Sequence, residues 1–225
     1  MISLLKRYIP SISDAECDKF VSYYRLLLDW NSRMNLTAIT DPEEVVKKHF
    51  LDSLSAMPYI KQGSSVADIG TGAGFPGIPL LIMRPDIHLT LVDALQKRVL
   101  FLETVLSELG LQAECCHMRA EDFGRVPAFR EQFDCCVSRA VSSLPVLLEL
   151  TVPLLKVGGN SICYKGDPEK EAESSQNALR SLSASMEIVP LDSDYGARSL
   201  IICTKNAPTK NRYPRKAGIL KKTPL

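Results

Sequence analysis

The feature that most restricts the fold is a glycine-rich stretch that directly follows an apolar run of strand character. The run Val66-Ala-Asp-Ile leads into Gly70-Thr-Gly72-Ala-Gly74-Phe-Pro-Gly77, and a segment with helical spacing comes next. Glycine lets a backbone approach a ligand closely, and the N-terminus of a helix favours anionic and polar groups. The sequence therefore predicts a strand, a ligand-binding glycine loop and a helix in direct succession.

The rest of the chain after residue 65 repeats this alternation of apolar strands and amphipathic helices, which is typical of a parallel sheet with helices on both faces. The last two expected strands follow each other without a helix, so at least one junction should be antiparallel. We expect strands near 65–69, 88–93, 113–118, 133–138, 160–165, 186–190 and 199–204, and helices over 76–84, 95–109, 143–155 and 168–183. The predicted class is α/β with a seven-stranded, mostly parallel sheet.

Two helices are expected before this sheet. Ser13 and Glu16 have the spacing of a capping box, and helical periodicity then continues to about Trp30, followed by a loop over residues 31–37. Asp41 before Pro42 marks the start of the second helix. We therefore divide the chain into an N-terminal helical extension (1–58), a ligand-binding core (59–205) and a basic C-terminal tail (206–225).

The charge is divided unevenly along the chain. Lysine and arginine total 27 against 26 acidic residues, a net charge of +1, yet no acidic residue occurs from Tyr195 onward, where eight are basic. Subtracting these eight leaves 19 basic against 26 acidic, so the body carries −7 and the end +8. The end therefore has the charge of a nucleic-acid-binding arm, although the average does not.

Composition and motifs exclude several other classes. Hydrophobic residues at 45% and charged residues at 24% are ordinary for a globular protein. The chain has no apolar run of membrane-spanning length, no secretory signal and no CxxC pair, and adjacent strand cysteines such as Cys135 and Cys136 point to opposite faces. We expect a cytoplasmic protein with reduced thiols and no metal.

The glycine loop allows two alignments. Gly72-x-Gly74-x-x-Gly77 satisfies the dinucleotide fingerprint, with Asp93 at the end of the next strand. Asp68-x-Gly70-x-Gly72-x-Gly74 instead looks like motif I of the Rossmann-like methyltransferases, in which the loop lies under the amino acid part of S-adenosylmethionine. Pro76 has no N–H for a pyrophosphate, and no second domain remains for a dehydrogenase substrate, so the methyl donor is favoured.

More specific motifs make the chain resemble one family, the bacterial small-subunit ribosomal RNA guanine-N7 methyltransferases, also called glucose-inhibited division protein B. They are Asn35-Leu-Thr-Ala-Ile39, His49-Phe-Leu-Asp52-Ser-Leu54, Asp68-Ile-Gly-Thr-Gly-Ala-Gly-Phe-Pro-Gly-Ile-Pro79, Asp93-Ala-Leu-Gln-Lys97-Arg98, Ser138-Arg139-Ala140, Tyr164-Lys165-Gly166 and Arg212-Tyr-Pro-Arg215-Lys-Ala-Gly218. The resemblance covers about residues 25–225. It implies a class I S-adenosylmethionine-dependent fold and transfer of a methyl group to guanine N7 of 16S ribosomal RNA.

The resemblance also implies the site. S-adenosyl-L-methionine is the expected cofactor, and its expected contacts are Asp68, Gly70, Gly72, Gly74, Phe75, Asp93, Ala120, Glu121 and Arg139. Arg139, Lys165 and Arg198 are expected to position the reactants, and Lys165, Arg198, Arg212, Arg215 and Lys216 to bind RNA. The Arg212–Arg215 stretch fits an arm that follows phosphates. The expected partner is 16S ribosomal RNA or the small ribosomal subunit, and the protein is expected to be a monomer.

The chemistry of guanine N7 fits what the sequence contains. N7 has an in-plane lone pair and no proton, so methyl transfer to it needs alignment and exclusion of water rather than a general base. The sequence has no carboxylate pair, cysteine nucleophile signature or histidine dyad, and His49, His88 and His117 are interpreted as structural. Two alternatives stay open at this point: an NAD(P)-dependent oxidoreductase, and a non-catalytic RNA-binding ribosome assembly factor.

Overall fold

The computed structural model describes residues 1–166 and 168–225. Within them a seven-stranded sheet has the order β3-β2-β1-β4-β5-β7-β6, in which β7 is antiparallel to β5 and β6 and the remaining pairs are parallel. The strands are β1 (Ser65–Ile69), β2 (His88–Asp93), β3 (Glu114–His117), β4 (Phe133–Arg139), β5 (Leu155–Lys165), β6 (Ala184–Leu191) and β7 (Arg198–Lys205). The predicted α/β class and its antiparallel junction are confirmed.

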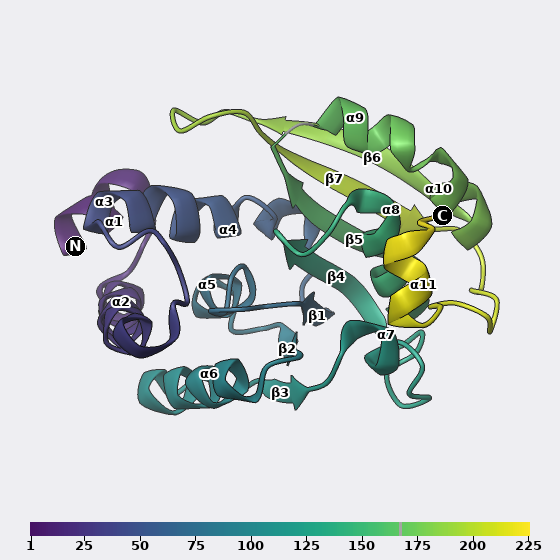
Figure 1. Cartoon of the computed structure of the whole chain (residues 1–225). Coiled ribbons are helices and arrows are strands. Elements are labelled where there is room, and N and C mark those ends of the chain that lie inside the picture. Colours follow the sequence, from purple (N-terminus) through teal and green to yellow (C-terminus); the bar gives the residue numbers. More distant parts are fainter. Residues whose placement is uncertain (167) are drawn as a thin grey trace.

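Helices cover both faces of the sheet (Figure 1). One face packs against α2 (Asp14–Met34), α5 (Gly77–Met83) and α6 (Gln96–Leu109), and the other against α7 (Ala120–Phe123), α8 (Leu144–Thr151) and α10 (Gln176–Leu182). The remaining helical segments are α1 (Ile2–Tyr8), α3 (Pro42–Val45), a π-helical stretch (Val46–Leu51), α4 (Asp52–Leu54), short 3-10 turns at Met57–Tyr59 and Val152–Leu154, α9 (Pro168–Ser174) and α11 (Ala217–Lys222).

The N-terminal helices differ from the prediction in two respects. α1 was not expected, because it is short and has no side-chain cap. α2 begins at the predicted capping box but continues past Trp30 to Met34, so the expected loop over 31–37 is wrong in its first half. The ring of Trp30 packs on Phe101 of α6 with 5.5 Å between centroids, and Asn35 in the left-handed conformation ends the helix.

These helices share the sheet's main hydrophobic core rather than forming a core of their own. Tyr23 of α2 is fully buried, and its hydroxyl donates a hydrogen bond to the carbonyl of Ala73 in the glycine loop. The N-terminal segment therefore supports the glycine loop directly.

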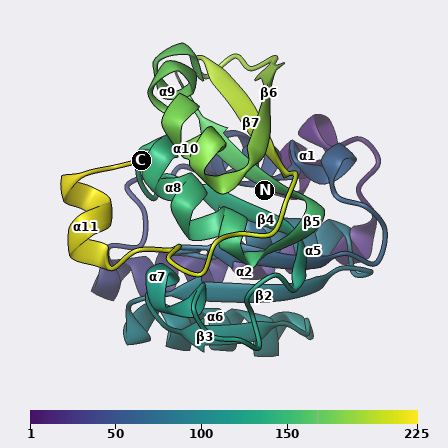
Figure 2. The ribbon, with the colours of Figure 1, turned by 90° about the vertical axis from the view of Figure 1, so that its right-hand side faces the viewer.

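The C-terminal segment is not an extended tail in this structure. It crosses the molecule beside α7 and α8 and ends in α11, a helix that the sequence pattern did not indicate (Figures 1 and 2). Tyr213 and Leu220 are buried. Residues 217–222 of the predicted tail therefore form a helix, whereas residues 213–216 form neither helix nor strand.

The structure also shows the positions of the cysteines, and it can be searched for metal-binding clusters and membrane-spanning helices. Cys135 and Cys136 lie in the cores on opposite faces of the sheet, as predicted, and the described cysteines are all unpaired. The described residues contain no cluster of side chains suited to a metal ion. They also include no helix with the length and apolar character needed to cross a bilayer.

Candidate functional site

The glycine loop lies where β1 ends and α5 begins, at the carboxyl edge of the sheet. Gly70, Gly72 and Gly74 have φ values of +69°, +61° and +93°, a region that side-chain-bearing residues rarely adopt. At Gly70 space is also limiting, since a Cβ would lie 2.6 Å from Cγ2 of Val141. Glycine therefore suits the backbone conformation of the loop, and a larger residue at Gly70 would have to displace the Val141 side chain.

Asp68 accepts hydrogen bonds from two residues of the glycine loop. Its Oδ2 accepts hydrogen bonds from the Thr71 hydroxyl at 2.7 Å and from the Gly77 N–H at 2.8 Å, while Oδ1 is buried without a partner among the described residues. Burial raises the pKa of the Asp68 carboxyl to about 7, against the opposing effect of these hydrogen bonds. Asp68 therefore lies beneath the loop and outside the lining of the neighbouring cavity.

That cavity, of about 610 Å³, opens beside the ends of β1, β2 and β4. Four of the predicted cofactor contacts line it: Gly70, Asp93, Ala120 and Glu121. The other predicted contacts, which are Asp68, Gly72, Gly74, Phe75 and Arg139, are not part of its lining. The structure therefore places some of the predicted cofactor contacts in the cavity. The others lie in the glycine loop or on its far side from the cavity, a region called here the region behind the loop.

Asp93 links the cavity to the glycine loop. Its Oδ2 accepts from the Gly72 N–H at 3.0 Å and from Arg98 at 3.3 Å, and its Oδ1 accepts from the Leu95 N–H at 2.9 Å. A carboxylate has about four lone-pair positions, so acceptor capacity remains for hydroxyl groups in the cavity. Leu95 and Val141, two of the exposed apolar side chains, provide apolar surface in the same lining.

Behind the loop, two arginines share one buried carboxylate. Asp52, which has no exposed side-chain surface, accepts from Arg139 at 2.9 Å and from Arg198 at 2.7 Å through both Nε and NH2. Arg139 also lies over the Phe75 ring, 5.0 Å from its centroid. Two predicted positioning residues are thus brought together, and Asp52, which the sequence marked only as part of a motif, holds them.

His49 completes this cluster in its neutral form. Its Nδ1 lies 3.3 Å from NH2 of Arg139, and an arginine can only donate, so Nδ1 accepts and the ring proton is on Nε2. Nε2 then donates to the Thr37 hydroxyl at 2.8 Å. Burial, aided by the charge of Arg139, lowers the pKa of His49 to about 4, and its ring stacks on Phe75 at 4.5 Å. Both ring nitrogens are engaged, which agrees with the structural role predicted for His49.

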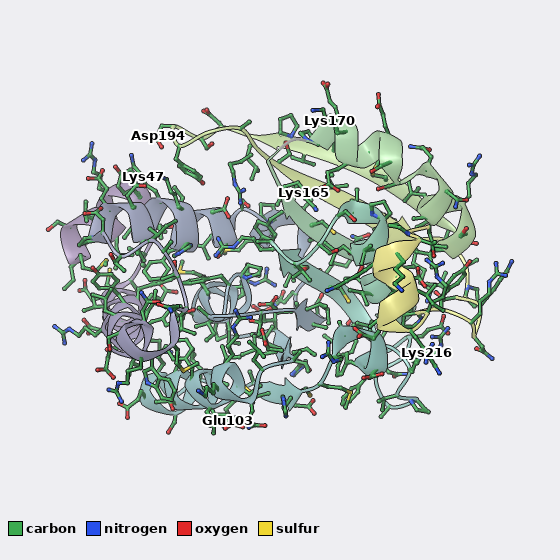
Figure 3. The ribbon with its side chains drawn as sticks, in the orientation of Figure 1. Lys47, Glu103, Lys165, Lys170, Asp194 and Lys216 are labelled. Carbon is green, nitrogen blue, oxygen red and sulfur yellow. The ribbon has the colours of Figure 1, made fainter. Side chains whose placement is uncertain are left out.

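The other predicted RNA-binding residues are dispersed. Lys165 donates to the Ser142 carbonyl at 2.7 Å and pairs with Glu171 at 3.0 Å. Arg212 lies over the ring of Tyr213, and Arg215 is paired with buried Glu149. Lys216 is exposed near α11, at the opposite end of the molecule from Lys47 and Asp194 (Figure 3). Arg215 is therefore held by a buried acid, as Arg139 and Arg198 are.

The sequence-based prediction missed one wall of the cavity. Residues of α8 and α11 line it, among them Val146, Leu150, Gly218 and Leu220. One signal was present in the sequence: Glu149 is the single charge in the apolar segment Leu144–Thr151, and a buried charge requires a partner. Nothing in the sequence indicated that Arg215 is that partner.

Comparison with known proteins identifies the family of this chain. Residues 16–200 match the family model described as GidB, rRNA small subunit methyltransferase G. The ribosomal RNA small subunit methyltransferase G of Desulfitobacterium hafniense (strain Y51) is 48% identical over 219 residues, covering 95% of this chain and 91% of the relative. The protein of the same name from Thermoanaerobacter sp. (strain X514) is also 48% identical, over 217 residues, covering 92% of this chain and 90% of the relative.

Solved structures support the fold. A methyltransferase from Pyrococcus furiosus has a TM-score of 0.58 at 14% identity, covering 84% of this chain and 98% of that chain. An rRNA methylase from Streptococcus thermophilus has a TM-score of 0.52 at 19% identity, covering 69% and 95%. The fold is that of the Rossmann-like methyltransferases. The chain belongs to the family described as GidB, rRNA small subunit methyltransferase G.

Proposed function

We propose that this protein transfers the methyl group of S-adenosylmethionine to N7 of a guanine in 16S ribosomal RNA of the small ribosomal subunit. The observation that carries the proposal is the cavity at the carboxyl edge of the sheet, bounded by Gly70 and Asp93. Ligands of open α/β sheets bind at this edge. The names of the relatives given above supply the class of acceptor.

The residues of the cavity fit the methyl donor. Asp93 would hold the ribose through its remaining acceptor position, and Ala120 and Glu121 would flank the adenine, with apolar support from Leu95. Gly70 would admit the donor close to the backbone because it carries no side chain. S-adenosylmethionine, when bound, supplies a methyl group on a positively charged sulfur.

The arginine cluster behind the loop supports the acceptor side. Asp52 balances one of the two arginines and His49 is neutral, so Arg139, Arg198, Asp52 and His49 together carry a charge of about +1. Arginine favours phosphate oxygens and the O6/N7 edge of guanine. We propose that Arg139 and Arg198 orient the RNA from positions fixed by Asp52.

The proposed reaction needs no side chain to remove a proton, because guanine N7 has none. The part of this chain is to align the acceptor and keep water away, and the stacked Phe75 and His49 rings provide a rigid apolar surface for that. We propose further that the protein acts as a monomer in the cytoplasm.

The test is calorimetric titration of the RNA-free protein with S-adenosylmethionine and, separately, with NAD. We expect binding of the methyl donor alone, and weaker binding by Asp93→Ala. Asp122→Ala is the matched control, because Asp122 is an exposed acid next to Glu121 that does not line the cavity. Binding of NAD without any response to the methyl donor would overturn the proposal.

A further inference from the structure

The C-terminal segment is tied to the body by hydrogen bonds to its backbone. Arg130 donates to the carbonyls of Thr209 at 2.8 Å and Tyr213 at 2.7 Å, and Arg125 donates to the carbonyl of Pro214 at 2.9 Å. These arginines belong to the turn between α7 and β4, so the segment has a defined path across the molecule (Figure 2).

The path ends at a buried ion pair. Glu149 of α8 is fully buried and accepts from the backbone N–H of Arg215 at 2.7 Å and from its guanidinium at 2.6–3.0 Å. Removing one partner of such a pair leaves an uncompensated buried charge, which is strongly unfavourable. Arg215 therefore fixes the point from which α11 begins.

From that point, α11 contributes to the wall of the cavity. Ala217, Gly218, Leu220, Lys221 and Lys222 line it together with Gly70 and Asp93. Leu220 is buried in a cluster with Val146 and Leu150 of α8, and Ala120, one of the predicted adenine contacts, packs against this cluster. The same small apolar cluster thus joins the C-terminal helix to the expected adenine end of the donor site.

We propose that α11 forms the outer wall of the adenine end of the methyl-donor site, and that Arg215 and Glu149 are positioning residues that hold it there. The proposal rests on the proposed function for the identity of the ligand. Its consequence is that the basic C-terminal segment controls donor affinity in the absence of RNA, and does not act as an RNA arm alone.

Gly218 offers a test that leaves the fold intact. It lines the cavity, its φ is not positive, and a Cβ there would meet no atom within 4 Å. The Gly218→Phe variant should therefore fold normally and fill the adenine end. Ile219→Phe is the matched control, because Ile219 is 47% exposed on the same helix and is not part of the lining.

The measurement is the dissociation constant of S-adenosylmethionine by calorimetry on RNA-free protein, with thermal melting of each ligand-free variant. We expect Gly218→Phe to weaken binding about tenfold, or about 1.4 kcal/mol, at an unchanged melting temperature. Ile219→Phe should bind within about twofold of the unmodified protein. Equal affinity of Gly218→Phe and the unmodified protein would overturn the inference.

A second variant tests α11 separately from the ion pair that anchors it. Truncation after Lys216 retains Arg215 and its ion pair but removes α11, and we expect a similar loss of donor affinity. With RNA and donor both present, the KM for the donor should rise while the KM for RNA changes less. A rise in the RNA KM alone would contradict the proposed wall. If the unmodified protein fails to bind the donor, the proposed function fails, which is a different outcome.

Discussion

Asp52 in α4 and Arg139 at the end of β4 form an ion pair of 2.9 Å that joins the N-terminal helices to the sheet beside the glycine loop. Because the same carboxylate also binds Arg198, one buried acid fixes two cations that come from different strands. The positions of the two arginines on the proposed acceptor side therefore depend on the carboxylate of Asp52.

Replacing Asp52 with Asn should remove the charge that holds both arginines. We expect the free energy of unfolding to fall by about 3 kcal/mol, because two partly buried guanidinium groups lose their counter-charge. Urea denaturation measures this. The control is Asp29→Asn, which breaks the exposed pair with Arg33 and should cost less than about 0.5 kcal/mol. Equal losses in the two variants would contradict the assigned role of Asp52.

Gly70 and Gly63 allow backbone strain to be separated from crowding, because both have a φ of +69°. An added Cβ meets Val141 at 2.6 Å at Gly70, but meets no atom within 4 Å at Gly63. Gly70→Ala should displace Val141 into the cavity and weaken donor binding about tenfold, while Gly63→Ala should leave the affinity unchanged. Calorimetry with S-adenosylmethionine measures both, and similar affinities of the two variants would argue against the cavity as the donor site.

Asp68 should make stability depend on pH in a defined direction. The folded-state pKa of about 7 lies above the unfolded value of 3.8, so the folded protein binds the proton more tightly. The stability contributed by the neutral carboxyl is present below pH 4 and is lost as the pH rises to about 7. The unfolding free energy of the unmodified protein should therefore fall relative to that of Asp68→Asn over this range. A difference that stays constant from pH 4.5 to about 7.5 would contradict the raised pKa.

Arg212 is an exposed basic residue of the C-terminal segment, so its contribution to RNA binding should be electrostatic. Arg212→Gln should reduce the slope of log affinity against log salt by about one unit and leave donor binding unchanged. Arg25→Gln, an exposed arginine of α2, serves as the charge-matched control. The same slope in both variants would show that RNA does not contact this part of the segment.

Most of the fold could be predicted because local pattern and tertiary structure agree. Apolar strands of four to eleven residues, the capping box at Ser13 and the glycine loop each specify their own conformation. α1 and the end of α2 could not be predicted, since α1 lacks a capping side chain and Trp30 is held by its packing on Phe101. A contact such as that between Trp30 and Phe101 joins segments that are distant in the sequence, so local sequence patterns do not reveal it.

The residues that line the cavity could likewise be predicted only where they do not depend on contacts between segments that are distant in the sequence. Gly70, Asp93, Ala120 and Glu121 lie at or just after the carboxyl ends of parallel strands, so their convergence on one edge follows from the topology. The wall formed by α11 depends on the pairing of Arg215 with Glu149. The eight basic residues after Tyr195 are equally compatible with an arm in solvent. Only the three-dimensional position of Glu149 distinguishes these cases.

The most direct test of the central claim is methylation of small ribosomal subunits from cells that lack this gene. The purified protein is incubated with these subunits, or with their 16S ribosomal RNA, and labelled S-adenosylmethionine, and 7-methylguanosine is then mapped by strand cleavage. We predict one labelled guanine at N7, and greatly reduced labelling with Asp93→Ala. Label at another atom or in another RNA, or no transfer despite donor binding, would contradict the proposed function.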